Sequence, residues 1–341
     1  MAYTLLCIDP QIDFHEGGSL AVKGATDDSN RLIQLITSKP PAKTVVSLDT
    51  HTPNHIGHAA FWVDASGNNP SPFTTLLIKE CDVDGTGIIY ATKPNSQEIT
   101  VYTPVKKDLT TWANYYVKHL PDTGRAEMFI WPNHCIEGTN GHLVHPPLKE
   151  AFNTLTTPVQ YHMKGQNEAT EMYSIFAAEL PVEKNSANGA PADLYSGTLP
   201  AQETGLSTTQ DVASGSYLKT DDNTALVDYL ADGGLPIVVC GQALSHCVNW
   251  STRDLKRLLG TRKNKIILLS DCSSAVGGFE KQAGALLEWC TANEVNVMTA
   301  AEFQRSLAGG RRRRSTRHRG KRSAKKATKK RRGHKGHRNC Q

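Results

Sequence analysis

Four reactive side chains follow short apolar runs along the chain. Asp9 ends the run LLCID, Asp49 ends TVVSLD, Lys164 ends VQYHMK, and Cys247 stands a few residues beyond IVVCG. In an open parallel sheet the carboxyl ends of the strands lie at one edge, and ligands bind there near the point where the strand order reverses. We therefore expect these four groups to meet at one site.

Cys247 is the candidate nucleophile. A cysteine attacks a carbonyl as its thiolate, which a helix N-terminus, a nearby cation and a proton acceptor favour. Cys247 begins the expected helix CVNWSTRDLKRLL, Lys164 offers the cation, and Asp9 can accept the proton. The preceding turn, Gly241 to His246, offers backbone N–H groups for the oxygen of a tetrahedral intermediate. The sequence thus predicts a Cys–Asp–Lys triad.

Each of these residues also has an ordinary interpretation. Asp9 by itself suits a turn or a helix cap, Lys164 a solvated strand end, and Cys247 a small core residue. His246, next to the cysteine, is a rival base, although adjacent residues at a helix start usually point apart. The joint occurrence of the three favours catalysis over three separate structural roles.

A second group of residues has the composition of a metal site. The segment DTHTPNHIGH carries one carboxylate and three imidazoles, and WPNHC adds another imidazole. Such donors suit Zn²⁺, Fe²⁺ or Mn²⁺, and D-x-H-x₃-H lets one loop carry three ligands. The alternative is that these histidines are ordinary polar loop residues; Cys135 is interpreted as structural, with a soft ligand as the alternative. The candidate ligands are Asp49, His51, His55, His58 and His134.

Short apolar, β-branched runs alternate with segments of helical character, which predicts an α/β fold. Several runs are apolar on consecutive positions, as strands covered on both faces are. We expect a doubly wound, mostly parallel, Rossmann-like sheet of about six strands with helices on both faces. The expected strands are Tyr3–Asp9, Lys43–Asp49, Val159–Lys164, Pro236–Gly241, Lys265–Asp271 and Val295–Ala300, and the expected helices include Asp28–Leu35, Thr224–Ala231, Val248–Leu259 and Phe279–Ala292.

Charge divides the chain into two parts. Of its 38 Lys and Arg residues, 16 lie from Arg311 onward without one Asp or Glu, which leaves 22 basic against 33 acidic side chains before that point. We predict one folded domain over residues 1–309 and a disordered basic tail over 310–341. Two insertions interrupt the domain: about 65–127, with some structure of its own, and about 183–222, a lid or a mobile loop.

The basic tail predicts binding to nucleic acid or another anionic surface through residues 311–338, by salt-sensitive counterion release. No aromatic residue is interleaved there, so base stacking is not indicated, and the alternative is a solubilising appendage. Eight cysteines, several of them inside apolar runs, indicate a reducing compartment. The sequence has no recognisable signal peptide or membrane span. We predict a cytoplasmic protein, or a nuclear one through clusters such as RRRR and KKRR, and a homo-oligomer is left open.

Five motifs resemble, in the same order, those of the nicotinamidases and related isochorismatase-like hydrolases. They are IDPQIDF, DTHTPNH, WPNHCIEGTNGHLVHP, HMKGQNEATEMYS and GQALSHCVNWSTRDL, and the resemblance covers about Met1 to Arg305. The chain is longer than the usual nicotinamidases and departs from them at Pro10, Ile12 and the segment HIGHAAFW. The resemblance implies a longer branch of the superfamily, with the isochorismatase-like hydrolase fold over residues 1–309.

The resemblance also implies a role for each matching residue. Asp9 would be the base, Lys164 would stabilise charge, and Cys247 would be acylated. The backbone N–H groups of Ala243 and Cys247 would form the oxyanion hole, with a cis peptide bond just before Ala243.

The same resemblance implies one divalent metal ion, with zinc ahead of iron and manganese. It would hold water and contact the pyridine nitrogen of the substrate. Phe14 and Trp131 would pack on the ring. The implied ligands are Asp49, His51 and His134, with His55 as the further ligand of some relatives.

The expected activity is the hydrolysis of nicotinamide to nicotinate and ammonia through a Cys247 acyl-enzyme, a step in the salvage of NAD. One alternative is the hydrolysis of another small amide or of a carbamoyl amine. The other is a nucleic-acid-associated protein with an inactive hydrolase scaffold. The presence of Asp9, Lys164 and Cys247 together favours an active enzyme.

Overall fold

The computed structural model describes residues 2–80, 87–93, 97–182, 184, 189, 211–216 and 220–308, with only the backbone described at residue 80 and over 211–216. The basic tail and most of the expected insertion at 183–222 lie outside these residues. The disorder of the tail, its binding to anionic partners and its role in localisation therefore stay predictions. Among the described helices, none has the length and apolar character needed to cross a membrane.

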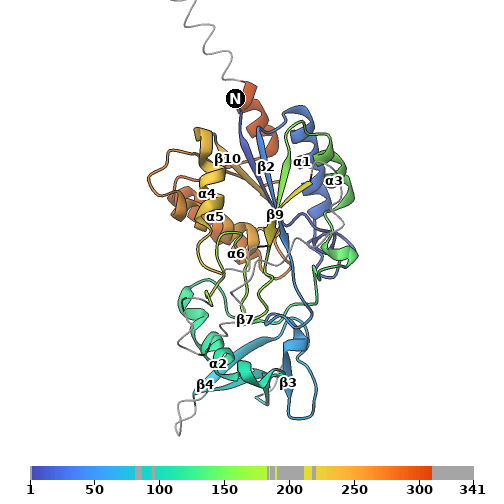
Figure 1. The fold of residues 1–341 in the computed structure, drawn as a ribbon, viewed down its shortest axis with the longest axis vertical. Helices are drawn as coiled ribbons and strands as arrows, with labels where there is room; N and C mark the ends of the chain where they lie inside the picture. Colours follow the sequence, from blue (N-terminus) through green and yellow to red (C-terminus); the bar gives the residue numbers. More distant parts are fainter. Residues whose placement is uncertain are drawn as a thin grey trace, which may run out of the picture.

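A parallel sheet of seven strands forms the larger part of the molecule (Figure 1). Six of the strands are those expected from the sequence, which confirms the predicted fold class. The seventh, β9, pairs in parallel with the outer edge of β8. The sequence predicts a lid or a loop there, but residues 211–216 form a strand because the free edge of β8 offers backbone partners. In spatial order the strands are β12 (Asn296–Met298), β11 (Ile266–Leu269), β10 (Ile237–Gly241), β1 (Thr4–Ile8), β2 (Lys43–Asp49), β8 (Val159–Lys164) and β9 (Asp211–Ser216).

Helices cover both faces of this sheet. Strand β1 shows why, because Leu6 and Ile8 belong to one buried cluster and Leu5 and Cys7 to the other. A strand that is apolar on consecutive positions needs cover on both sides. One face is covered by α4 (Thr224–Ala231), α5 (Cys247–Leu259) and α6 (Glu280–Ala292), and the other by α1 (Ala25–Ser38), α3 (Pro146–Asn153) and a helix over 300–308.

The strand order reverses between β1 and β10. From β1 the chain proceeds outward through β2, β8 and β9, and from β10 it proceeds the other way through β11 and β12. Gly241, the last residue of β10, has φ +109°, and a Cβ there would overlap the carbonyl oxygen of Ile8. Only glycine allows β1 and β10 to approach so closely at this switch point, where ligands bind in such folds.

A smaller antiparallel sheet with one helix lies beyond the carboxyl edge of the large sheet (Figure 1). It comprises the expected insertion at 65–127 and a few residues on either side. Trp112 and Tyr116 of α2 (Thr110–His119) pack with Leu76 and Ile89 of the sheet in a separate buried core. The strands, in spatial order, are β3 (Trp62–Asp64), β6 (Ile99–Pro104), β5 (Gly87–Thr92), β4 (Thr75–Glu80) and β7 (Met128–Phe129).

Candidate active site

Lys164 joins the three other strand-end residues at the switch point. Its Nζ lies 2.9 Å from Asp9 Oδ2, 2.9 Å from Asp49 Oδ1 and 3.5 Å from Cys247 Sγ. It also donates to the carbonyl of Met172 at 3.0 Å. All four charged or reactive side chains are buried, with Cys247 the most exposed at 5%. The structure thus places Asp9, Asp49, Lys164 and Cys247 together, at the edge where the sequence predicts them.

Asp9 is oriented by the neighbouring strand. Ser47 of β2 donates from Oγ to Asp9 Oδ1 at 2.5 Å, and the Asp9 backbone N–H donates to the same hydroxyl at 3.0 Å. A carboxylate oxygen of Asp9 and Sγ of Cys247 lie within 4.8 Å of each other. Asp9 is therefore held where it can exchange a proton with the thiol.

Burial determines the protonation of this group. Burial raises the pKa of the Cys247 thiol well above its usual value; Lys164 opposes this rise and Asp9 reinforces it. Burial also raises the pKa of Asp9, against the opposing charge of Lys164. For Lys164, burial disfavours the charge, but Asp49 and Asp9 outweigh it and raise its pKa well above the usual value. A raised thiol pKa favours the protonated form of Cys247, and a raised carboxyl pKa makes Asp9 a better acceptor for that proton.

The turn before Cys247 presents two backbone N–H groups beside the thiol. Cys247 is the first residue of α5, and the peptide bond between Gln242 and Ala243 is cis, as the resemblance implies. Among the described residues, the backbone N–H groups of Ala243 and Cys247 take part in no backbone hydrogen bond, whereas those of His246 and Val248 both donate to the Ala243 carbonyl. Two free donors at a helix start suit an anionic oxygen.

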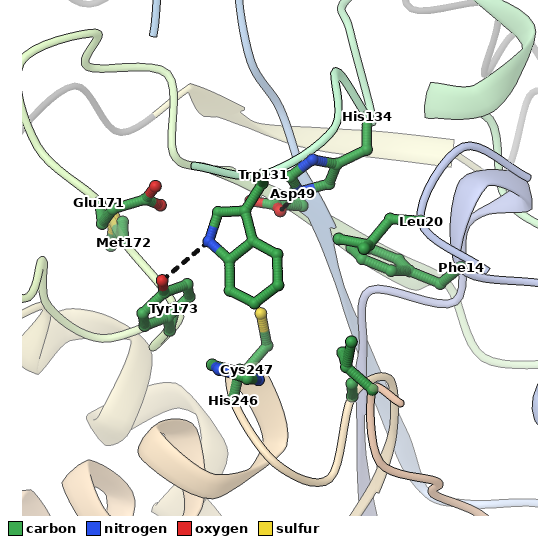
Figure 2. Close-up of a pocket in the computed structure, with 12 residues that line it drawn as sticks. Phe14, Leu20, Asp49, Trp131, His134, Glu171, Met172, Tyr173, His246 and Cys247 are labelled. Carbon is green, nitrogen blue, oxygen red and sulfur yellow. Dashed lines mark hydrogen bonds and ion pairs between the residues drawn. The ribbon is translucent and has the colours of Figure 1, made fainter. Parts of the chain in front are cut away.

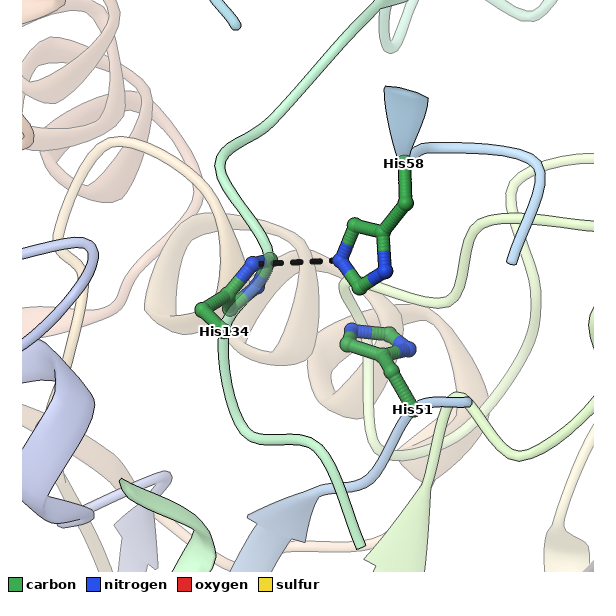
Figure 3. Close-up of side chains that lie close together, drawn as sticks. All are labelled: His51, His58 and His134. Atoms are coloured by element: carbon green, nitrogen blue, oxygen red, sulfur yellow. Dashed lines mark hydrogen bonds between the residues drawn. The ribbon is translucent and has the colours of Figure 1, made fainter. Parts of the chain in front are cut away.

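The imidazoles of His51, His58 and His134 lie close together (Figure 3). One ring nitrogen from each of His51, His58 and His134 lies within 4.8 Å of the other two. Asp49 Oδ2 lies 3.0 Å from His51 Nε2 and 3.3 Å from His134 Nε2. Tetrahedral ligands of zinc lie about 3.3 Å apart. The donor set of one carboxylate and three imidazoles thus fits a divalent metal ion.

Backbone carbonyls orient these three rings. His51 Nδ1 lies 3.0 Å from the carbonyl oxygen of Gly165. His58 Nδ1 lies 3.2 Å from that of Thr52, and His134 Nδ1 lies 2.8 Å from that of Pro132. Donation from Nδ1 leaves the lone pair of each Nε2 for a metal, the usual arrangement of metal-binding histidines. The 3.4 Å contact between His58 Nε2 and His134 Nδ1 is longer than either ring's backbone contact.

His55 differs from His58 in this respect. Its Nε2 lies 3.0 Å from the Thr170 carbonyl, and its Nδ1 accepts from the Gly57 N–H at 3.1 Å. Both ring nitrogens are therefore engaged by the backbone, and His55 does not belong to the group of three imidazoles. The spacing D-x-H-x₃-H favours His55, whereas the geometry favours His58.

Gly165 fits closely against the metal donors. It follows β8, has φ +75°, and a Cβ on it would lie 2.7 Å from His51 Cε1 and 2.9 Å from Asp49 Oδ1. A larger residue would displace these groups, and the positive φ would strain it. In the sequence, the glycine after Lys164 indicates only a turn. In the structure, it leaves the space that His51 and Asp49 occupy.

A narrow pocket connects the thiol with the metal donors (Figure 2). Cys247 lies at one end and His134 with Asp49 at the other, and Phe14 and Trp131 line the space between them. The structure therefore brings both predicted ring-packing residues to the pocket. Further lining residues that the sequence analysis does not assign are Leu20, Glu171, Met172, Tyr173, His246 and Val276.

Glu171 is the least expected of these residues. It is 5% exposed, its Oε1 has no hydrogen-bond partner among the described residues, and it lies 3.9 Å from His55 Nδ1. Burial, together with the charges of Asp49 and Glu179, raises its pKa well above the usual value. An acid seven residues after Lys164 in a polar loop carries no periodic signal, so only the folded chain identifies it.

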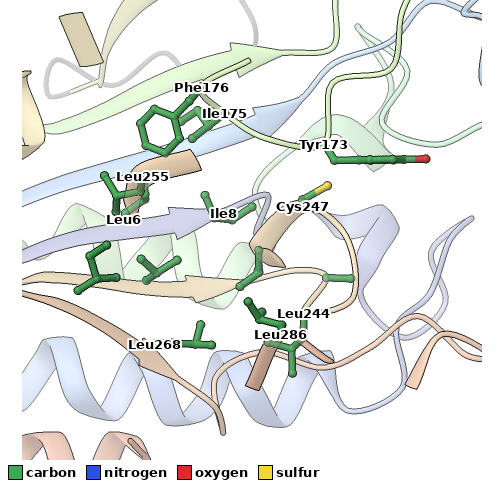
Figure 4. Close-up of a cluster of buried hydrophobic side chains, with 14 of the residues drawn as sticks. Leu6, Ile8, Tyr173, Ile175, Phe176, Leu244, Cys247, Leu255, Leu268 and Leu286 are labelled. Atoms are coloured by element: carbon green, nitrogen blue, oxygen red, sulfur yellow. The ribbon is translucent and has the colours of Figure 1, made fainter. Parts of the chain in front are cut away.

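The floor of the pocket is continuous with the core of the large sheet. Cys247 and Tyr173 lie at one end of a buried cluster that includes Leu6, Ile8 and Leu255 (Figure 4). Side chains in such close-packed surroundings hold one position. Cys247 thus lies on closely packed elements.

The sequence matches no family model and no curated protein. Several solved structures, however, have this fold. A nicotinamidase and pyrazinamidase from Acinetobacter baumanii aligns with a TM-score of 0.50 and 20% identity, over 88% of this chain and 97% of its own. The yeast nicotinamidase aligns with a TM-score of 0.51 and 18% identity, over 86% of this chain and 98% of its own. The complex of the yeast nicotinamidase with the inhibitor nicotinaldehyde aligns with a TM-score of 0.51 and 18% identity, over 87% of this chain and 99% of its own. The chain therefore has the fold of the nicotinamidases.

Proposed function

We propose that this protein is a metal-dependent cysteine amidohydrolase that converts nicotinamide to nicotinate and ammonia. The observation that carries the proposal is the contact of one buried ammonium, Lys164, with Asp9, Asp49 and Cys247. This contact joins the nucleophile and base to a carboxylate of the metal donors. The likeness in fold to nicotinamidases supports the choice of reaction class.

The first half of the reaction forms a thioester. Asp9 takes the thiol proton, and the Cys247 sulfur attacks the amide carbon. The resulting oxyanion accepts from the N–H groups of Ala243 and Cys247, and Lys164 balances the negative charge near the sulfur. Asp9 then returns the proton to the nitrogen, the C–N bond breaks, and ammonia leaves.

The second half releases the acid. Asp9, again a carboxylate, takes a proton from a water molecule that attacks the thioester. As the C–S bond breaks, Asp9 gives this proton to the sulfur, which restores the thiol. Nicotinate is the product. The overall reaction consumes one water and needs no oxidant or reductant.

The pocket shape supports an aromatic amide. Phe14 and Trp131 line the space between Cys247 and His134, so a flat ring placed there has aromatic neighbours and its carboxamide reaches the sulfur. We propose Asp49, His51, His58 and His134 as the residues that hold the metal. When bound, the metal would supply a Lewis-acidic contact for the pyridine nitrogen.

The decisive experiment measures ammonia release from nicotinamide by the wild type and by Cys247→Ala. We expect turnover by the wild type and a loss of at least about 10³-fold in the variant, because no other group in the pocket replaces the sulfur. Mass spectrometry of acid-quenched wild type should detect a nicotinoyl adduct on the peptide that contains Cys247. Equal ammonia release by both proteins would rule out the proposed nucleophile, and no release by either would rule out nicotinamide as the substrate.

A further inference from the structure

A second cavity, here called the outer groove, adjoins the catalytic pocket. It lies between the small-sheet region, including Arg125 and Phe129, and the helices α5 and α6. It is the wider of the two: the space within it, open solvent included, is about 1460 Å³, against about 370 Å³ for the catalytic pocket. A primary amide such as nicotinamide uses none of this space, so the proposed reaction leaves the groove without a role.

The two cavities share a layer of rings. Trp131, Tyr173 and His246 line both of them. The ring centroid of His246 lies 5.0 Å from that of Trp131 and 5.2 Å from that of Tyr173, and Trp131 Nε1 donates to the Tyr173 hydroxyl at 3.0 Å. His246 directly precedes the nucleophile. The groove therefore begins next to the reacting sulfur.

The groove adjoins the amide end of the pocket. Phe14, Asp49 and His134, at the ring-binding end, line the catalytic pocket alone, whereas His246, at the thiol end, is shared. A substituent that extends from the substrate into the groove would therefore be attached to the amide nitrogen.

Arg253 gives the groove a positive charge. His246, Trp250 and Arg253 have the spacing i, i+4, i+7, so they follow one face of α5 from the ring layer into the groove. Arg253 Nε donates to Asn249 Oδ1 at 2.7 Å, and its guanidinium lies over the rings of Trp250 and Trp289, 5.1 and 4.7 Å from their centroids. Among the described residues it has no acidic partner, so its remaining N–H groups can bind an anion.

The second arginine of the groove differs from Arg253. Arg125 is bound by both carboxylate oxygens of Asp254, at 3.0 and 2.6 Å, and lies 3.6 Å from Glu179. Its charge is already balanced. Glu127, the one acid among the residues that line the groove, is exposed, so its charge is screened by solvent.

We propose that the outer groove binds an anionic substituent, a carboxylate or a phosphate, carried on the amide nitrogen of the substrate and held by Arg253. The inference rests on the proposed function and extends it to secondary amides. Hydrolysis follows the same steps: Asp9 protonates the nitrogen, the C–N bond breaks, and an amine that ends in an anion leaves in place of ammonia. Water then completes the reaction at the thioester.

The test compares two amides of equal chain length, N-(3-carboxypropyl)nicotinamide and the neutral N-butylnicotinamide, by chromatographic measurement of the nicotinate released. We expect the wild type to favour the carboxylated amide by about tenfold or more in kcat/KM, as a charge-assisted hydrogen bond provides. Arg253→Gln should bring this ratio close to one. Lys256→Gln, which removes a positive charge from α5 outside the groove, should leave the ratio unchanged.

The outcomes separate this inference from the proposed function. A kcat/KM ratio near one in the wild type would overturn the inference. So would an equal fall of this ratio in Arg253→Gln and in Lys256→Gln. Turnover of nicotinamide without turnover of either secondary amide would overturn it as well. Turnover of the carboxylated amide without turnover of nicotinamide would support the groove and refute nicotinamide as substrate. If the wild type hydrolyses none of the three amides, both proposals fail. Free butyrate that inhibits nicotinamide turnover without any cleavage of the carboxylated amide would identify an anion site unconnected with catalysis, and would also overturn the inference.

Discussion

At the scale of single residues, Lys164 links the proposed catalytic group to the proposed metal donors. Its ammonium contacts one oxygen of Asp9 and one of Asp49, and the other oxygen of Asp49 faces His51 and His134. Burial works against the charge on Asp49, but His51 and Lys164 outweigh it and lower its pKa well below the usual value. Neither group is electrostatically independent of the other.

Substituting Lys164 tests this link. In Lys164→Met the two carboxylates lose their shared cation while they stay buried, so we expect a loss of about 3 to 5 kcal/mol in the free energy of unfolding. Amide hydrolysis should be abolished as well. Urea unfolding followed by circular dichroism measures the first effect. A stable Lys164→Met protein with a normal unfolding midpoint would contradict the interpretation of Lys164 as the cation shared by the two carboxylates.

The choice between His58 and His55 is also made at this scale. We expect His58→Ala to weaken zinc affinity by at least about tenfold, because it removes one imidazole from the donor set, and His55→Ala to weaken it less. Competition with a chromogenic chelator measures both affinities without any activity assay. A larger loss in His55→Ala would instead return the fourth position to the residue favoured by the sequence spacing.

At the scale of elements, the segment that follows β8 connects the parts of the molecule around the site. Its Glu179 accepts from the Tyr173 N–H at 3.3 Å and lies 3.6 Å from Arg125, which in turn binds Asp254 of α5. Burial raises the pKa of Glu179 to about 7, against the opposing charge of Arg125. This network joins the loop, the small-sheet region and the helix that bears Cys247.

The raised pKa predicts how stability depends on pH. Between the ordinary value of 4.5 and about 7, the folded state binds a proton that the unfolded state has lost. The contribution of Glu179 is therefore fully present below pH 4.5 and is lost as the pH rises through 7. We expect Glu179→Gln to gain about 3 kcal/mol of unfolding free energy relative to the wild type between pH 4.5 and 7.5, at about 1.4 kcal/mol per pKa unit.

Urea unfolding at pH 4.5, 6 and 7.5 measures this difference. Glu288→Gln, on the exposed side of α6, serves as the control for removal of a surface carboxylate. A difference between Glu179→Gln and the wild type that stays constant over this range would show that Glu179 is charged throughout.

At the scale of the whole molecule, the small sheet contributes to both cavities. With α5 and α6 it forms the outer groove, and its last strand, β7, leads directly into Trp131 of the catalytic pocket. The expected insertion therefore contributes to the surroundings of the site. Substrate range is the property it can most directly change.

The basic tail belongs to the same scale. Truncation after Gly310 should leave the kcat/KM for nicotinamide within about twofold of the wild-type value, because the composition of the tail predicts a segment without a packed core of its own. The full-length protein should bind duplex DNA with a steep dependence on salt, and the truncated protein should lose this binding. Ammonia release and fluorescence anisotropy measure the two properties. A collapse of turnover on truncation would show that the tail takes part in catalysis.

The pattern of residue types along the chain predicts the large sheet and the residues at its carboxyl edge. Consecutive apolar runs specify strands that are buried on both faces, and a reactive residue at the end of such a run can only lie at one edge. Asp9, Asp49, Lys164 and Cys247 were therefore predictable, as were the six strands.

Three features are evident only in the folded chain: the geometry that favours His58 over His55, the place of Glu171 in the pocket, and the outer groove. These features depend on which backbone carbonyl or side chain meets a loop residue across long separations in sequence. His55 pairs with the carbonyl of Thr170, and Arg253 becomes part of a groove only because residues 124–129 lie opposite α5. The local sequence pattern does not predict such long-range contacts, because loops lack the periodicity that relates a residue to its neighbours in space.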